Sequence, residues 1–349
     1  MNQRPPNHLI DPCNRHLNYL RVSITDRCNL ACAYCLPEDS VPRLAHADIL
    51  RYEEILRVVR VAVRLGITKV RVTGGEPLVR KGVCEFLTQL AAVPGLRDLS
   101  VTTNGVLLRK NIEQIRKAGI SRVNISLDTL KPDRYRSITG MDFFGQVWDG
   151  ILAAESLGFH PIKLNAVALQ GVNDDELIDL ARLCFEHPFH VRFIEFMPIG
   201  RSQFAGKPTL LVPEIMQRIA ALGRLVPVPR SEHDGPARRY RIEGARGEIG
   251  FISAISRHFC DRCNRLRLTA SGHLRPCLMS DCQEDLKGPM RRGCSDDDLA
   301  FSTAYAGDIS IKWEEVVNLK TEEPIKIVLS DETTVQGPVL PGAGGQVSV

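Results

Sequence analysis

The chain has 349 residues, of which 44% are hydrophobic and 25% are charged, values that are typical of a globular protein. Its formal net charge of +4 is small for this length and counts against nucleic-acid binding. We expect no membrane partner, because no window approaches the roughly eighteen apolar residues of a membrane span. The first residues lack the apolar core of a signal peptide, so the expected location is cytoplasmic.

The cysteines favour metal binding over disulfides, because most of them fall into two tight groups. The first group consists of Cys28, Cys32 and Cys35, spaced C-x3-C-x2-C. Three thiolates so close together can converge on one metal site, since thiolate is the preferred ligand of iron–sulfur clusters and zinc. A structural zinc site normally has four protein ligands, whereas a site with three leaves one position free for chemistry.

The order of predicted elements indicates an α/β fold. A helix is predicted over residues 52–65, because Ile55, Val59 and Val63 recur at helical spacing and Gly66 follows as a stop signal. Strand-like runs lie at residues 21–25, 69–73, 99–103, 122–127, 162–169 and 191–196, with helical stretches between them. This alternation predicts βα units and a parallel sheet, and about six units are fewer than the eight of a closed barrel. Polar residues follow the strand ends, where ligands bind in such folds.

The second group of cysteines consists of Cys260, Cys263 and Cys277, spaced C-x2-C-x13-C, again without an obvious fourth ligand. Cys282 or His258 could complete a zinc ribbon here, and that alternative stays open at this point. The other cysteines are interpreted as packing or surface thiols, and Cys282 is left without an assigned role.

Both groups resemble motifs of one enzyme superfamily. The first spacing, with Tyr34 before the last cysteine, resembles the cluster motif of the radical S-adenosylmethionine (SAM) enzymes. The Gly-Gly-Glu-Pro turn at residues 74–77 resembles their second common element. The stretch from Phe259 to Leu278 resembles the C-terminal cluster motif of the molybdenum cofactor biosynthesis protein A family. The resemblance covers residues 19–299.

The resemblance implies the fold, the domains and the cofactors. It implies a partial (βα)6 TIM-like barrel over residues 1–205 and a C-terminal lobe over residues 206–299 that closes the barrel. Residues 300–349 diverge, and no role is assigned to them. The implied cofactors are SAM and two [4Fe–4S] clusters, which are expected to face one another across a single cavity. The first group of cysteines would hold the cluster that binds SAM, and the second group the cluster that binds substrate.

Members of this family are GTP 3′,8-cyclases, which act early in molybdenum cofactor biosynthesis. The resemblance implies that a 5′-deoxyadenosyl radical removes the ribose 3′ hydrogen of GTP and that C3′ then bonds to guanine C8. Glu76 or backbone oxygens would pair with the SAM ammonium. The expected SAM contacts are Tyr34, Gly75, Ser126 and Met197. The expected GTP contacts are Arg21, Arg71, Thr102, Lys163, Arg265 and Arg267.

The basic residues in the strands favour a nucleotide substrate. Arg21, Arg71 and Lys163 alternate with apolar neighbours such as Val22 and Leu164, so they should share a face directed into the barrel. Arg offers phosphate a bidentate fork and Lys a point charge. The alternatives are a radical SAM enzyme that modifies a peptide and a non-enzymatic zinc or iron–sulfur binding module. The resemblance also implies an electron donor and a downstream pterin-forming protein, and it leaves a homodimer open.

Overall fold

The computed structural model describes residues 9–10, 15–35, 43–197, 204, 208–229, 235–279 and 282–299, and four short strands after residue 324. The chain forms two compact units, residues 1–307 and residues 308–349. The domain boundary expected at 205/206 falls outside the described residues, the one expected at 299/300 falls at the edge of a described segment, and both stay predictions.

The first unit is built on one sheet, which in the described residues has the strand order β12-β11-β10-β1-β2-β3-β4-β5-β6-β9-β8-β7. The strands in chain order are β1 (Tyr19–Ser23), β2 (Lys69–Thr73), β3 (Asp98–Thr103), β4 (Val123–Ser126), β5 (Ile162–Ala168), β6 (His190–Glu195), β7 (Val226–Pro227), β8 (Arg238–Arg241), β9 (Glu248–Ile252), β10 (Arg265–Leu268), β11 (His273–Arg275) and β12 (Glu284–Asp285). All pairs from β10 through β1 to β6 and β9 are parallel, and the outer strands are antiparallel. All six expected strands are present as β1 to β6, which confirms the predicted parallel α/β fold.

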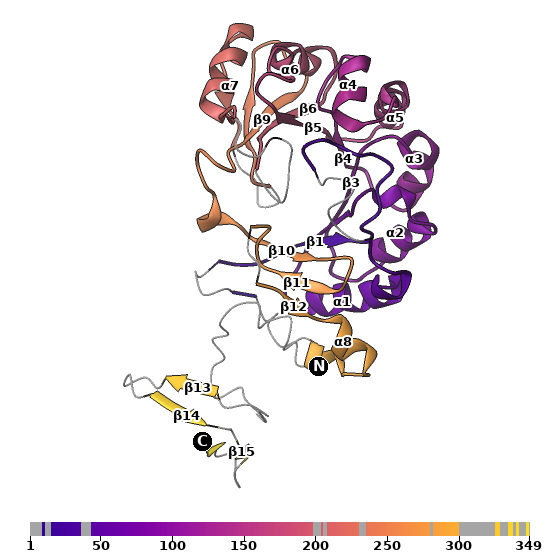
Figure 1. Ribbon diagram of the computed structural model, residues 1–349, viewed down its shortest axis with the longest axis vertical. Helices are drawn as coiled ribbons and strands as arrows, with labels where there is room; N and C mark the ends of the chain where they lie inside the picture. Colours follow the sequence, from indigo (N-terminus) through magenta and orange to yellow (C-terminus); the bar gives the residue numbers. More distant parts are fainter. Residues whose placement is uncertain are drawn as a thin grey trace. The chain divides into compact units, whose positions relative to one another are not determined.

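Helices cover the outer side of this curved sheet, as Figure 1 shows for α1 to α6. The helices are α1 (Tyr52–Arg64), α2 (Val83–Ala91), α3 (Leu108–Lys117), α4 (Pro132–Thr139), α5 (Phe144–Ser156), α6 (Leu177–Glu186), α7 (Val212–Ile219) and α8 (Lys287–Arg291). The predicted helix 52–65 is confirmed as α1. Glu54 fixes its start by accepting the backbone N–H of Arg51 at 2.6 Å, and the chain leaves the helix at Gly66 with φ 98°.

Alternation along the strands separates an apolar outer layer from a basic inner one. Val22, Val70 and Leu164 belong to the buried core under the helices. Each such side chain contributes roughly 1.5–3 kcal/mol by leaving water. Arg21 and Arg71 occupy the intervening positions and are paired in register across β1 and β2. Because successive side chains of a strand point to opposite faces, the expected inner face of cations is confirmed for these two residues.

The sheet continues past the six predicted strands, and this positions the C-terminal thiols. β10 pairs with β1, with Arg267 beside Arg21, and β9 pairs with β6. The connection over residues 253–264 therefore joins strands at opposite edges of the parallel row, and Figure 1 shows it in orange between β9 and β10.

The second unit has two antiparallel strand pairs, β13 (Ile325–Val328) with β14 (Thr334–Gly337) and β15 (Leu340–Pro341) with β16 (Val347–Ser348). In the part of the chain that the structure describes, no helix is both long and apolar enough to span a membrane.

Candidate active site

The first thiol trio, Cys28, Cys32 and Cys35, lies in the loop after β1, at the carboxyl edge of the parallel strands. Backbone bonds hold this loop against the end of α4: the N–H groups of Ala31 and Ala33 donate to carbonyls of α4 at 2.9 Å. All three cysteines are free thiols. Burial raises the pKa of Cys32, and Asp128 and the other two thiols raise it further, so the three sulfurs lie within electrostatic reach of one another.

The Gly-Gly-Glu-Pro turn packs its backbone directly on this loop. Gly75 donates its N–H to the carbonyl of Thr25 at 2.8 Å. A Cβ on Gly75 would lie 2.4 Å from the carbonyl oxygen of Arg27, and one on Gly74 would lie 2.7 Å from that of Thr25. Glycine is therefore required because two backbones meet here. The contact of Gly75 with SAM stays a prediction.

Glu76 does not offer its carboxylate to a ligand. It is fully buried. Its Oε1 accepts the Leu78 N–H at 3.0 Å and the Thr103 hydroxyl at 2.8 Å, and its Oε2 accepts the Asn104 N–H at 2.6 Å. Burial raises its pKa to about 7 although these hydrogen bonds lower it. Either Glu76 or backbone oxygens were expected to pair with the SAM ammonium. Because the Glu76 carboxylate is already hydrogen-bonded, the backbone oxygens of the turn remain as the candidate partners.

A buried polar network that the sequence did not reveal supports the loop at Tyr34. The Tyr34 hydroxyl donates to Oδ2 of Asp128 at 2.6 Å, and Asp128 Oδ1 accepts the Val167 N–H at 2.8 Å. Asn173 Nδ2 donates to the backbone carbonyl of Asp128 at 2.7 Å. Burial raises the pKa of Asp128 to about 6, against the lowering effect of the Tyr34 hydrogen bond. Asp128 therefore ties the thiol loop to the ends of β4 and β5.

The other expected SAM contacts lie at the same carboxyl edge. Ser126 ends β4, and Met197 lies two residues after the end of β6. Both are half-buried, and their contact with SAM stays a prediction.

Three arginines form a row across the inner face. Arg267, Arg21 and Arg71 are direct neighbours in register on β10, β1 and β2. Burial of its guanidinium lowers the pKa of Arg21 to about 9, and the two flanking arginines add to this. Within the described residues, Arg21 Nε and the Thr102 hydroxyl are buried without a hydrogen-bond partner. An anion would offset the repulsion between these like charges, and an anion or a water molecule would accept hydrogen bonds from the unpaired donors.

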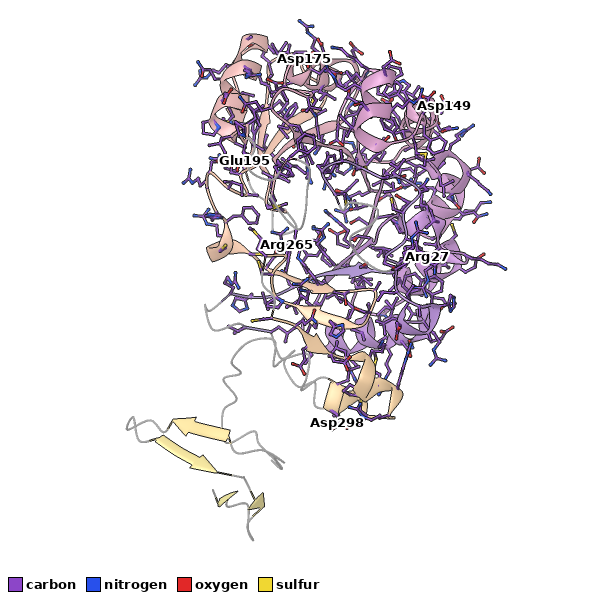
Figure 2. The ribbon with its side chains drawn as sticks, viewed as in Figure 1. Arg27, Asp149, Asp175, Glu195, Arg265 and Asp298 are labelled. Atoms are coloured by element: carbon purple, nitrogen blue, oxygen red, sulfur yellow. The ribbon has the colours of Figure 1, made fainter. Side chains whose placement is uncertain are left out.

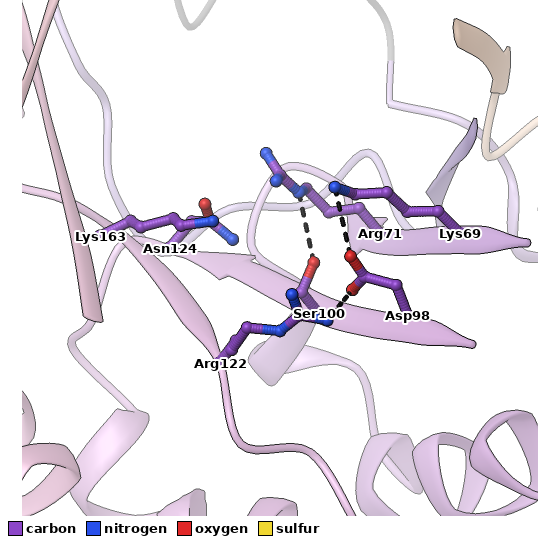
Figure 3. Close-up of a pocket in the computed structure, with 7 residues that line it drawn as sticks. All are labelled: Lys69, Arg71, Asp98, Ser100, Arg122, Asn124 and Lys163. Atoms are coloured by element: carbon purple, nitrogen blue, oxygen red, sulfur yellow. Dashed lines mark hydrogen bonds and ion pairs between the residues drawn. The ribbon is translucent and has the colours of Figure 1, made fainter. Parts of the chain in front are cut away.

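A pocket extends this basic surface toward the amino ends of β2 to β5 (Figure 3). Its lining consists of Lys69, Arg71, Asp98, Ser100, Arg122, Asn124 and Lys163. Asp98 lies between Lys69, whose Nζ is 3.2 Å from Oδ2, and Arg122. Arg71 Nε donates to Ser100 at 3.4 Å. Burial lowers the pKa of Lys163 to about 6, and the cations Arg192 and Arg71 lower it further.

Sequence reasoning missed Lys69, Asp98, Arg122 and Arg192. The signal for Lys69 was present, because it lies two residues before Arg71 in the same strand and must share its face. Asp98 gave no such signal, since it begins a strand whose other residues are not basic.

The second thiol trio lies in a basic environment at the other end of the strands. Cys260 and Cys263 come just before β10, and Cys277 follows β11, which is antiparallel to β10. Because β10 is parallel to β1, this trio is level with the amino ends of the strands, whereas the first trio follows their carboxyl ends. The arginine row lies between the two, and a single cavity joining them stays a prediction.

Arginines surround these thiols. Burial raises the pKa of Cys263, but Arg265 and Arg15 outweigh it, so the pKa lies below its usual value. Burial lowers the pKa of Arg267, and the charges of Cys263 and Cys277 act in the opposite sense. Arg265 in turn lies 5.2 Å from the centre of the Phe259 ring.

The donor set fits two iron–sulfur clusters better than a zinc ion. Among the described residues, no three His, Cys, Asp or Glu side chains are arranged to share one metal ion, and neither Cys282 nor His258 completes such a group. A four-iron cluster does not require that arrangement, because its thiolates bind different irons.

Family models match the chain in two consecutive parts. The radical SAM superfamily matches residues 22–184, and the family Molybdenum Cofactor Synthesis C matches residues 189–316.

Curated relatives match over most of the chain. A GTP 3′,8-cyclase of Moorella thermoacetica is 51% identical over 86% of this chain and 93% of its own length. One of Pelotomaculum thermopropionicum is 50% identical over 83% of this chain and 90% of its own.

Solved structures share the fold at low sequence identity. Streptococcus suis SuiB bound to S-adenosylmethionine has a TM-score of 0.59 and 16% identity, and the match covers 77% of this chain and 63% of SuiB. Native anSMEcpe with bound AdoMet has a TM-score of 0.56 and 14% identity, covering 83% of this chain and 80% of that one.

Proposed function

Because the chain belongs to the GTP 3′,8-cyclase family of the radical SAM superfamily, we propose that it cyclises GTP to 3′,8-cyclo-7,8-dihydro-GTP at a site between its two thiol trios. Cys28, Cys32 and Cys35 would hold the cluster that binds SAM. Cys260, Cys263 and Cys277 would hold the cluster that binds guanine. When bound, the clusters and SAM supply the 5′-deoxyadenosyl radical that removes the ribose 3′ hydrogen and the open iron that holds the purine.

The row of Arg267, Arg21 and Arg71 is the observation that supports a nucleotide substrate most strongly. Three adjacent guanidiniums on the inner face provide forked donors for phosphate oxygens. A bound triphosphate would satisfy the unpartnered Arg21 Nε and relieve the mutual repulsion of the row. Lys163 would add a point charge from β5 when it takes up a proton together with the triphosphate.

The first trio and its support serve a different purpose. Tyr34, fixed by Asp128, and the tightly packed Gly75 hold the thiol loop and the glycine turn as one rigid edge. Such a fixed edge would present backbone oxygens to the SAM ammonium. Ser126 and Met197, at the ends of neighbouring strands, would contact the rest of SAM.

Arg265 and Arg267 connect the two ligands. They alternate with buried Leu266 and Leu268 along β10, so both reach the inner face. Because they lie beside the second thiol trio, they would place the guanine near its cluster while they contact the phosphates. Thr102, on β3, would complete the site with its unpartnered hydroxyl.

The proposal is tested with anaerobically reconstituted protein, dithionite, SAM and GTP. We expect 5′-deoxyadenosine to form only when GTP is present, with one cyclised product for each SAM cleaved. Cleavage of SAM that ignores GTP but responds to a peptide would contradict the proposal. About eight irons per chain are expected from two four-iron clusters, and about one zinc would also contradict it. The electron donor, the pterin-forming partner and the cytoplasmic location stay predictions.

The peptide-modifying alternative has weaker support. SuiB and anSMEcpe share the fold of this chain at 16% and 14% identity, which says nothing about substrate. The relatives that are 51% and 50% identical over most of the chain are GTP 3′,8-cyclases.

A further inference from the structure

Glu195 is a fully buried carboxylate at the end of β6 that belongs to neither thiol site. Donors from two other segments point at it. Its Oε1 accepts the Val212 N–H at 2.7 Å and the hydroxyl of Ser256. Its Oε2 accepts the N–H groups of Ile255 at 2.7 Å and Ser256 at 2.8 Å. Burial raises the pKa of Glu195, but these hydrogen bonds outweigh it, so its pKa lies below the usual value and the group is charged at neutral pH.

The segment held by this carboxylate leads directly to the second thiol trio. Ile255 and Ser256 begin the connection over residues 253–264 between β9 and β10. In Figure 2, Glu195 lies at one end of this connection and Arg265 at the other. Cys260 comes four residues after Ser256, and four extended residues span at most about 14 Å. A fixed Ser256 therefore limits where Cys260 can lie.

The far end of the connection has its own anchors. Asn264 Nδ2 donates to Asn18 Oδ1 at 2.6 Å, and Tyr19 N donates to the Asn264 carbonyl at 3.2 Å. Arg15 donates to the carbonyl of Cys260. The connection is thus held at both ends, and three of the four donors to Glu195 come from its first residues.

We propose that Glu195 is a positioning residue that holds the connection so that Cys260 and Cys263 can bind their cluster and present it to substrate. This rests on the proposed function only for the identity of the substrate. Glu195 lies two residues before Met197, so the same anchor sets the second thiol site relative to the expected SAM pocket. The negative charge matters, because all four hydrogen bonds described for the carboxylate come from donors. A glutamine would turn an NH2 toward donors and leave some of them unsatisfied.

The test compares Glu195→Gln with a matched control, Glu176→Gln. Glu176 is also almost fully buried and accepts the Thr129 hydroxyl at 2.7 Å, the Leu130 N–H at 2.8 Å and an N–H of Arg134, but it lies between the loops after β4 and β5. After anaerobic reconstitution, we expect Glu195→Gln to lose about four of about eight irons per chain, while the control keeps all of them. Electron paramagnetic resonance should still show the first cluster and its response to SAM in both variants.

A second variant keeps the proposal testable if Glu195→Gln does not fold. Ser256→Ala removes only the side-chain donor and should keep both clusters, raise the KM for GTP severalfold and leave SAM binding unchanged. Full iron content and wild-type KM in both variants would overturn the proposal, as would equal iron loss in Glu176→Gln. Because iron content is read without GTP, failure of the cyclase activity itself would be distinguishable from failure of this inference.

Discussion

The two thiol trios have the same composition and opposite electrostatic surroundings. Near the first trio, Asp128 raises the pKa of Cys32 beyond the effect of burial, and Glu76 contributes in the same sense at Cys28. Near the second trio, Arg265 lowers the pKa of Cys263 against the effect of burial. Since the thiols themselves are alike, the surrounding charges distinguish the two sites.

This difference matches the ligands that the two sites are proposed to bind. SAM carries a sulfonium and an ammonium, so an edge whose nearby charged groups are acidic suits this cationic ligand. GTP carries a triphosphate, so basic surroundings suit it. The second trio has such surroundings, because Arg267 of the arginine row lies on β10, the strand that follows Cys263. An enzyme that brings both ligands together must keep these two environments apart, and the length of the β-strands does so.

Removing one thiol from each trio should give the largest and most different effects. Cys28→Ala should abolish 5′-deoxyadenosine formation, because the cluster that binds SAM would be lost. Cys263→Ala should keep the first cluster and its electron paramagnetic resonance response to SAM but lose the cyclised product, because only the placement of guanine would fail. Each variant should lose about four of about eight irons. Liquid chromatography of both products and iron analysis check this. Loss of the SAM response of the first cluster in Cys263→Ala as well as in Cys28→Ala would mean that the sites are not functionally distinct.

Neutralising an arginine of the row should weaken the binding of GTP and leave the binding of SAM unchanged. Loss of a charge-assisted hydrogen bond costs about 1.5–3 kcal/mol, so Arg71→Ala should weaken GTP binding about 10- to 100-fold. Arg71→Lys should lose less GTP affinity, because lysine keeps the positive charge and lacks only the paired N–H donors of the guanidinium. Arg182→Ala is the control, since Arg182 pairs only with Asp179 in the contacts described for outer helix α6. Calorimetry with GTP and with SAM measures both affinities, and weaker SAM binding in Arg71→Ala would contradict this division.

The predictability of the two sites from sequence differs in a physical way. Both trios stand out in the sequence because their cysteines recur at short spacings, and strand alternation put Arg21 and Arg71 on one face, while their contact with GTP was implied by the resemblance alone. Asp128 and Glu195 were not found as supports, because their partners Tyr34 and Ser256 lie far away in the sequence. Only the folded chain brings such pairs together.

The fold shows the same limit. The βα alternation predicted β1 to β6, but β9 and β10 lie outside that alternation and pair with β6 and β1. Gly75 illustrates an intermediate case. The sequence indicated this glycine only as a contact of SAM, and the structure shows that a Cβ here would collide with the Arg27 carbonyl.

The basic pocket should make GTP binding dependent on pH. The pKa of Lys163 is about 6 in the free protein because of burial and nearby cations, so the amine is neutral above that pH. A triphosphate raises this pKa, and GTP must then bind together with a proton. The affinity should therefore fall as pH rises from about 6, by at most about tenfold per pH unit. Calorimetry in buffers of different ionisation enthalpy should detect proton uptake at pH 7.5. Lys163→Met should remove that uptake, and unchanged uptake in this variant would assign the proton to GTP or another group.

The smallest effect is expected at Asn104, which acts on the first trio without touching GTP. Its Oδ1 accepts the Val106 N–H at 3.1 Å, which fixes the amide so that Nδ2 donates to Asn29 Oδ1 at 2.8 Å and to Cys28 Sγ at 3.7 Å. A donor to a cluster thiolate stabilises the more negative, reduced state. Asn104→Asp keeps the size and removes the donor, so it should make the reduction potential of the first cluster more negative and leave that of the second unchanged. A redox titration followed by electron paramagnetic resonance separates the two clusters, and equal shifts in both would show that Asn104 acts through the fold as a whole.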